Sequence, residues 1–193
     1  MAGKNAVVLS GTGLLDDVVE RLIADGWDVV LPSRRYNPIA SRGTKTHHGR
    51  VRRTGPGRAF WVEAQWERPR ELALGAQWLL PIPAGLLVAW VHESYRRSVL
   101  GAIESSLAPG APVVEVRGSA GVLADSADAT LAAHPTQVVL LGTASDRDPS
   151  RALSLPEISA AVLDATGRAR RGGPPSLHQV GQRRPVRSQV FHR

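Results

Sequence analysis

Cysteine is absent from the sequence, so the chain can form no disulfide bond, no thiolate metal site and no cysteine nucleophile. Only two of its 24 basic residues are lysines, Lys4 and Lys45. No run of about 18 apolar residues occurs, so the sequence predicts no membrane-spanning helix. Lys4 is the only basic residue before the first apolar run, and that run is short, so the N-terminus does not have the pattern of a secretion signal. We therefore expect a cytoplasmic protein.

The net charge of +7 is distributed unevenly along the chain. Residues 34–58 hold eight basic residues and residues 168–193 hold seven, with no acidic residue in either segment. The rest of the chain holds nine basic residues and all 17 acidic ones. The basic segments lack the interleaved aromatic residues of single-strand binders. We expect solvated surface arms; the alternatives are a loop over cofactor phosphates and salt-dependent contact with nucleic acid.

Apolar runs and helical patterns alternate along the chain. Six runs have the length and β-branched composition of strands: residues 6–10, 27–33, 59–66, 86–92, 112–118 and 136–142. Apolar residues at helical spacing predict helices over residues 14–26, 69–80, 94–107 and 155–170. This alternation predicts an α/β fold with a doubly wound, mostly parallel, Rossmann-like sheet of about six strands, wound right-handedly.

Local signals mark several helix ends. Gly26 is expected to stop the first helix, and Ser94 is expected to be the N-cap of the third. The sequence Ser154-Leu155-Pro156-Glu157 is a capping box with a proline in the first turn of the last helix.

The length of 193 residues suits a single domain. We assign residues 1–170 to a Rossmann-like nucleotide-binding domain and residues 171–193 to a basic C-terminal tail without a core of its own. Residues 36–57 are rich in glycine, proline, arginine and histidine and predict a long basic loop insertion. Adjacent histidines in that loop, His47 and His48, are not expected to hold a metal ion among so many cations.

The first apolar run leads into a glycine turn, Gly11-Thr12-Gly13, followed by Leu14 and Leu15. The first glycine permits a sharp bend from strand to helix, and the second lets the backbone approach a pyrophosphate at the helix N-terminus. Asp16 replaces the third glycine of the G-x-G-x-x-G motif, and its charge opposes a pyrophosphate unless it points away or caps the helix. We predict a dinucleotide-binding turn; the alternative is a turn that merely requires glycine.

The second apolar run ends in Ser33-Arg34-Arg35, where NAD-binding sites place an acidic residue for the ribose hydroxyls. A guanidinium can instead pair with a 2′-phosphate and stack on adenine, and a hydroxyl can donate to the phosphate. These residues therefore predict NADP rather than NAD, unless they simply begin the basic loop.

The two motifs resemble those of the short-chain dehydrogenase/reductase superfamily, in its atypical, short branch. The resemblance covers roughly residues 4–168 and implies an NADP-dependent oxidoreductase. It implies that Gln65 and Trp66 border the adenine and that Trp90 lines the nicotinamide-side ribose. It implies also that Gly142 and Thr143 pack near the nicotinamide and that Ser119 matches the active-site serine.

The catalytic Tyr-x-x-x-Lys pair of the superfamily is missing. The chain has only two tyrosines, Tyr36 and Tyr95, and neither is followed by lysine four residues later. His92 could instead transfer a proton and Tyr95 could donate to a carbonyl or imine, while Ser119 could orient a substrate. Alternatively, backbone groups satisfy His92, and Tyr95 only packs in the first turn of its helix.

We expect an oxidoreductase that exchanges a hydride between NADP and a small organic substrate. A non-catalytic NADP(H)-binding regulator or partner subunit is the first alternative, favoured by the missing pair. A nucleic-acid-associated protein that uses its basic arms is the second. A membrane partner is not expected, and a homo-oligomer is expected only by analogy with the superfamily.

Overall fold

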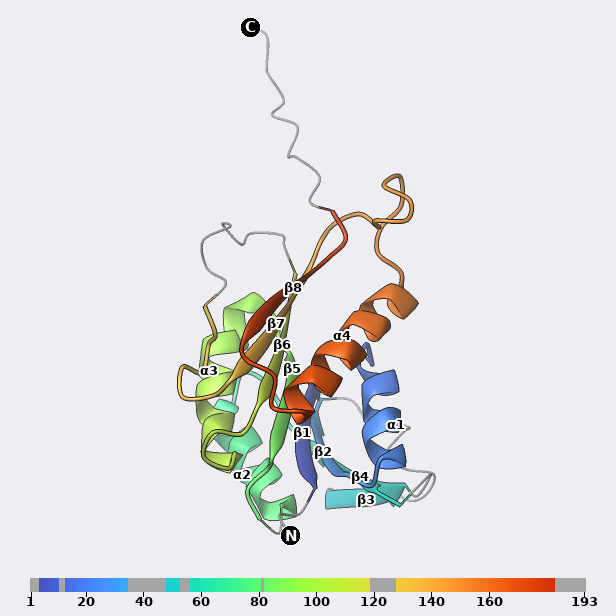
Figure 1. The fold of residues 1–193 in the computed structure, drawn as a ribbon. Helices are drawn as coiled ribbons and strands as arrows, with labels where there is room; N and C mark the ends of the chain where they lie inside the picture. The colour runs from blue at the N-terminus through green and yellow to red at the C-terminus, as the bar shows by residue number, and fades with distance from the viewer. Residues whose placement is uncertain are drawn as a thin grey trace, which may run out of the picture.

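A parallel sheet runs through the centre of the computed structural model, which describes residues 4–10, 13–34, 48–52, 56–80, 82–118 and 128–182 (Figure 1). The strands are β1 (Asn5–Ser10), β2 (Asp28–Ser33), β3 (His48–Arg52), β4 (Arg58–Glu63), β5 (Leu86–Trp90), β6 (Val113–Gly118), β7 (Thr136–Leu141) and β8 (Ser176–Val180). The helices are α1 (Asp16–Ala24), α2 (Pro69–Leu79), α3 (Glu93–Ile103) and α4 (Leu155–Arg170), and a 3₁₀ turn, η2 (Glu104–Ser106), follows α3.

Within these ranges the sheet has the strand order β3-β4-β2-β1-β5-β6-β7-β8. All neighbouring strands are parallel except β3, which pairs antiparallel with β4 at one edge. The expected α/β, Rossmann-like fold with a mostly parallel sheet is confirmed.

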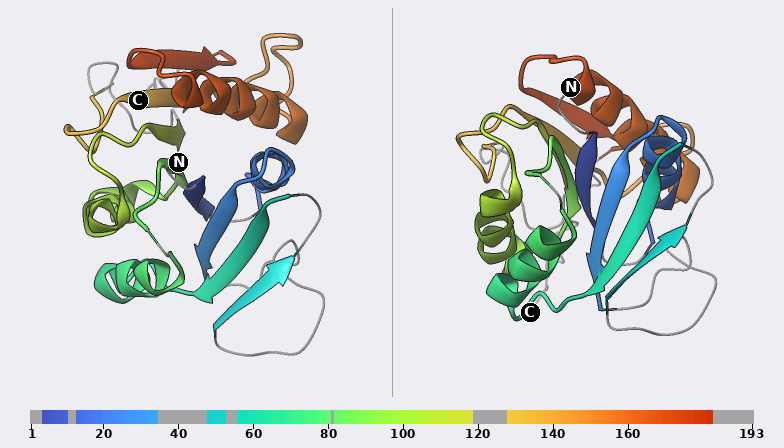
Figure 2. Two further views of the ribbon diagram at one scale, coloured as in Figure 1. Left: turned by 60° about the horizontal axis from the view of Figure 1, so that its bottom comes forward. Right: turned by 90° about the horizontal axis from the view of Figure 1, so that it is seen from below.

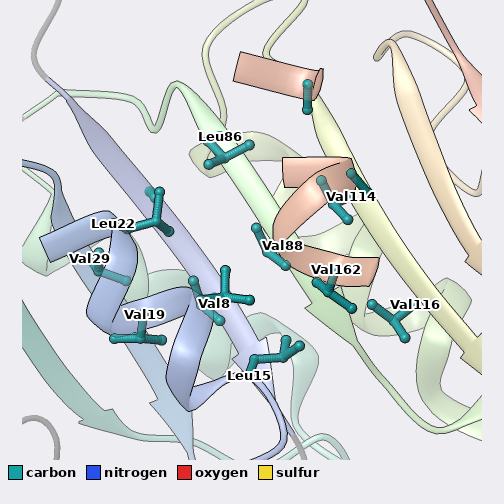
Figure 3. Packing of buried hydrophobic residues seen from close by; sticks show 14 of the residues in the cluster. Val8, Leu15, Val19, Leu22, Val29, Leu86, Val88, Val114, Val116 and Val162 are labelled. Atoms are coloured by element: carbon teal, nitrogen blue, oxygen red, sulfur yellow. The ribbon is translucent and has the colours of Figure 1, made fainter. Parts of the chain in front are cut away.

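Helices cover both faces of the sheet (Figure 2). One core lies between the sheet and the pair α1 and α4, where Val8, Leu22 and Val162 are almost fully buried (Figure 3). A second core lies on the other face, beneath α2 and α3. Because β1, β5 and β7 are buried between these layers, their sequences show no polar alternation.

Local sequence signals fix most helix ends. Gly26 follows α1 with φ +83°, a conformation that favours glycine. The expected capping box is present at α4, where the Ser154 amide and hydroxyl both donate to Glu157 Oε2, at 2.9 and 2.7 Å. The N-cap of α3, however, is His92 and not Ser94.

Two segments that were expected to lack regular structure contribute strands. Within the expected loop 36–57, residues 48–52 form β3 on the edge of the sheet; residues 36–47 and 53–55 of that loop lie outside the described residues. The tail expected from residue 171 contains β8, which pairs with β7. Its sequence, SLHQV, is only half-buried at the sheet edge, so its apolar signal is weak.

The crossover connection that leads to the last strand has the opposite hand to the first connection. The connection β1–α1–β2 runs toward the β3 edge, whereas β7–α4–β8 runs toward the opposite edge. Since α1 and α4 pack in the same core on one face, the two connections have opposite hands. The expected right-handed winding therefore does not extend to β8.

None of the helices in the described part of the chain has the length and hydropathy needed to span a bilayer.

Candidate nucleotide-binding site

The predicted site residues gather at the carboxyl edge of the sheet. β1, β2, β4 and β5 are parallel neighbours, so their carboxyl ends meet at that edge. Gly13 follows β1, Arg34 follows β2, Trp66 follows β4 and His92 follows β5. The carboxyl edge at the central strands of a doubly wound sheet is where such folds bind ligands.

The glycine turn is described only from Gly13 onward, so the predictions for Gly11 and Thr12 lie outside the described residues. Gly13 has φ +75°, which favours glycine. Leu14 is half-buried, whereas Leu15 is fully buried in the core, so Leu15 can offer a ligand only its backbone.

Acidic residues surround this turn. A Cβ atom added to Gly13 would lie 3.1 Å from Asp16 Oδ2, and Asp17 also lies in the first turn of α1. Two carboxylates at a helix N-terminus interact favourably with the helix dipole, but they also oppose a bound anion. The backbone of Gly13 is therefore compatible with a dinucleotide-binding turn, whereas the charge of the two carboxylates disfavours a bound anion.

Arg34 and Trp66 form the best-defined contact at this edge. The Arg34 guanidinium lies over the indole ring, 6.0 Å from its centroid. Arg34 Nη1 is also 3.7 Å from Glu67 Oε1, and both side chains are largely exposed. A cationic group over an aromatic ring offers a 2′-phosphate a partner and adenine a stacking surface.

The neighbouring predicted residues differ in how they are placed. Ser33 Oγ accepts a hydrogen bond from Trp61 Nε1 at 3.2 Å, a link across β2 and β4 that sequence reasoning missed. Gln65 is exposed. The prediction for Arg35 lies outside the described residues.

Tyr95 joins the residues after β4 and β5 into one aromatic row. Its ring centroid lies 6.1 Å from that of Trp66 and 6.5 Å from that of His92. His92 Nδ1 accepts the backbone N–H of Ser94 at 3.3 Å, so one ring nitrogen caps α3. Tyr95 therefore lies beside Trp66, on the expected adenine side, and His92 lies beside Tyr95.

On the expected nicotinamide side, Gly142 and Thr143 are hydrogen-bonded to β8 and to the residues that follow it. The backbone N–H of Gly142 donates to the Val180 carbonyl at 2.7 Å, and that of Thr143 donates to the Gln182 carbonyl at 2.9 Å. Trp90 is partly buried and packs against the core beneath α1 and α4. Sequence reasoning missed the contact at Gly142 because it did not predict β8. The prediction for Ser119 lies outside the described residues.

A buried ionic cluster that sequence reasoning also missed lies beneath α3. Glu115 on β6 is 1% exposed, and its Oε1 accepts from Arg117 Nε at 2.9 Å. Arg96 Nε, from the first turn of α3, lies 3.1 Å from the same oxygen. Thr130 Oγ1 donates to it at 2.6 Å. The cluster thus ties α3 and β6 to the residues that follow the segment containing Ser119.

Similarity to known proteins is visible in the fold and not in the sequence. No protein-family model and no curated protein matches the chain. A short-chain dehydrogenase/reductase from Serratia marcescens superposes with a TM-score of 0.59 at 12% identity, covering 92% of this chain and 96% of that one. The chain has the fold of the short-chain dehydrogenases/reductases.

Two further similar structures of this fold contain cofactors. The NADH-dependent reductase A1-R′, complexed with NAD, has a TM-score of 0.58 at 12% identity and covers 93% of this chain and 95% of its own. A blue fluorescent protein from a metagenomic library, in complex with NADPH, has a TM-score of 0.54 at 16% identity and covers 93% and 97%.

The chain departs from the superfamily pattern after β6. No tyrosine follows Tyr95 and no lysine follows Lys45 in the sequence, so the region after β6 cannot supply the Tyr-x-x-x-Lys pair. Lys4 precedes β1 and therefore lies at the opposite edge of the sheet. Residues 128–135, the described part of the connection to β7, contain no helix.

Proposed function

We propose that this chain binds NADP(H) at the carboxyl edge of the sheet and is an NADP-dependent oxidoreductase acting on a small organic substrate. The observation that carries the proposal is the Arg34 guanidinium over Trp66, beside the strand that leads into the glycine turn. The fold, which this chain shares with the dehydrogenases and reductases described above, also supports it.

The residues divide the binding of the cofactor between them. Arg34 would pair with the 2′-phosphate, and Trp66 would stack against the adenine. The backbone of the Gly11-Thr12-Gly13 turn would approach the diphosphate. Asp16 would weaken this contact, because its carboxylate lies against Gly13.

The bound cofactor would supply or accept the hydride, and the protein would hold the substrate and move a proton. His92, Tyr95 and Ser119 remain the proposed groups for that proton and for orienting the substrate. In the described structure His92 Nδ1 is already engaged as the helix cap, which leaves Nε2 for proton transfer.

A specific observation favours a second function, a non-catalytic NADP(H)-binding regulator. The chain lacks the Tyr-x-x-x-Lys pair, and both His92 and Tyr95 belong to the aromatic row that includes Trp66. A protein that binds the cofactor without turnover needs the adenosine contacts but no proton donor at the nicotinamide.

Cofactor binding is tested by titrating the protein with NADPH and with NADH and following tryptophan fluorescence. We expect tighter binding of NADPH, and a loss of about tenfold in NADPH affinity in Arg34→Glu with little change for NADH. Arg97→Glu, on the exposed surface of α3, is the matched charge reversal and should change neither affinity. Equal affinity for the two cofactors in the parent protein would contradict the 2′-phosphate contact.

Turnover separates the two functions. A panel of carbonyl and imine substrates is assayed by NADPH absorbance with the parent, His92→Ala and Tyr95→Phe. Consumption that falls in either variant supports the oxidoreductase. NADPH binding with no substrate consumed supports the regulator.

Binding of nucleic acid and assembly into a homo-oligomer are also proposals. Retention on DNA that is absent, or that does not depend on salt, would remove the nucleic-acid function of the basic arms. A homo-oligomer is tested by sedimentation of the full chain.

A further inference from the structure

A cavity of about 650 Å³ lies at the opposite edge of the sheet from the nucleotide site, between α1 and α4. Its lining includes Lys4, just before β1, and Asp25, just after α1, which place it at the amino ends of the strands. Figure 1 shows the two helices side by side on the same face. Its volume falls within the range of small-molecule sites, about 300–1,000 Å³.

The floor of this cavity is apolar. Val18 and Leu22 from α1 and Leu163 from α4 line it, together with the partly buried Trp27. The Trp27 Nε1–H is buried and has no hydrogen-bond acceptor among the described residues. An aromatic or other apolar group would be well accommodated on this floor.

The rim of the cavity is mainly cationic. Four cations, Lys4, Arg21, Arg170 and Arg171, line it against two carboxylates, Asp25 and Asp164. Arg170 already has two partners within the protein. Its Nη1 lies 2.6 Å from Asp25 Oδ2, and its guanidinium lies 5.3 Å from the Trp27 ring centroid. Arg171 makes no ion pair within the described ranges, and Lys4 Nζ donates only to the Asp25 backbone carbonyl, at 3.1 Å.

We propose that the cavity between α1 and α4 is a second ligand site that binds an organic anion with an aromatic or apolar body, such as an aryl carboxylate or aryl sulfonate. Lys4 and Arg171 attract the anionic group, and the floor around Trp27 receives the body. β1 has six residues, so it separates this cavity from the glycine turn by about 20 Å. A ligand in this cavity would therefore not contact a ligand at the glycine turn, and we propose that the two sites bind independently.

The test uses the full chain and 8-anilinonaphthalene-1-sulfonate, an aryl sulfonate whose fluorescence rises in apolar surroundings. We expect saturable binding with one molecule per chain, quenching of tryptophan emission, and no displacement by excess NADPH. Lys4→Glu with Arg171→Glu should weaken binding about tenfold, and Asp164→Asn should strengthen it. These side chains are exposed, so circular dichroism should show unchanged folding in the variants.

Two controls locate the probe. Arg97→Glu reverses a charge on the other face of the sheet and should leave binding unchanged. Trp78→Ser removes a tryptophan that is 71% exposed on α2, beside which the probe could bind non-specifically. Loss of the fluorescence signal in Trp78→Ser, displacement by NADPH, or unchanged affinity in the doubly reversed variant would each overturn the proposal.

Discussion

Arg117 Nε donates a hydrogen bond of 2.9 Å to Glu115 Oε1, and both side chains are almost fully buried on the same strand, β6. Two residues apart on a strand, they point to the same face, beneath α3. Arg117 Nη2 also donates to the Asp128 carbonyl at 2.7 Å. The pair therefore holds residue 128, within the connection from β6 to β7, against β6.

Removing one partner of this buried pair should destabilise the protein strongly. In Glu115→Ala, Arg117 and Arg96 would lose the carboxylate that they share, and the free energy of unfolding should fall by about 3–5 kcal/mol. Urea denaturation followed by circular dichroism measures this. Glu93→Gln, an exposed partner of Arg96, should cost about 1 kcal/mol or less. Similar losses in the two variants would show that the buried pair contributes no more than the exposed one.

Neutralising Asp16 should strengthen cofactor binding. In Asp16→Asn the carboxylate beside Gly13 is lost, so NADPH affinity should rise about threefold to tenfold. The same change should reduce stability by about 0.3–1 kcal/mol, because an acidic residue in the first turn interacts favourably with the helix dipole. Fluorescence titration and thermal melting measure the two effects.

Asp17→Asn is the matched control for this prediction. It removes an equal charge from the same turn of α1, but Asp17 is exposed and is not the carboxylate against Gly13. A gain in affinity as large as that of Asp16→Asn would point to the general charge of the turn. A loss of affinity in Asp16→Asn would mean that its carboxylate assists binding.

Glu157 should make stability depend on acid pH. Hydrogen bonds from Arg151, Ser145 and Ser154 hold the pKa of this carboxyl far below its usual value of 4.5. Because the folded pKa is depressed, the contribution is complete well above pH 4.5 and is lost as the pH falls from there toward the folded pKa.

The comparison of the parent with Glu157→Gln isolates this contribution from those of other carboxyl groups. We expect the variant to melt at a lower temperature at neutral pH, and the difference between the two proteins to shrink steadily in more acidic buffer. Melting temperatures measured across that range give the curve. A difference that stays constant with pH would exclude the charged carboxylate as its source.

A methyl group at Gly142 should destabilise the end of the sheet. Its Cβ would lie 2.7 Å from the Gln182 carbonyl oxygen and 2.7 Å from the Gly181 carbonyl carbon. Gly142→Ala should therefore cost about 1–3 kcal/mol in urea denaturation. Gly101→Ala, on the exposed side of α3 with open space around it, should instead stabilise by about 0.5–1 kcal/mol. Equal effects of the two changes would contradict the close approach at Gly142.

Much of the fold follows from short-range patterns. Buried runs predicted six of the strands, and helical spacing predicted the four helices of the described chain to within a few residues at each end. The capping box at Ser154 and the helix stop at Gly26 are also local, since each depends on residues within one or two turns. At the site, the sequence predicted that Arg34 lies at the end of the second strand, and the family resemblance placed Trp66 at the end of the third.

The contacts that define the candidate site could not be predicted from the sequence as well as the strands and helices could. Sequence reasoning assigned Ser94 as the cap of α3, because a serine there is the more usual choice, yet the His92 ring accepts the bond. The placement of Gly142 and Thr143 beside the nicotinamide stays a prediction, and the sequence did not show that their amides donate to the carbonyls of residues 180 and 182. Each outcome depends on how side chains or distant segments meet in space.

The sequence by itself determined six of the strands and the four helices of the described chain, and it determined that no Tyr-x-x-x-Lys pair can follow β6, because periodicity and composition are properties of neighbouring residues. Only the tertiary structure decided that β8 joins the sheet, that α4 shares a face with α1, and that Glu115 is buried with two arginines. These features depend on pairing between segments far apart in the chain. A weakly apolar strand such as β8 is held in place by its pairing with β7, and its own sequence of apolar residues does not predict it.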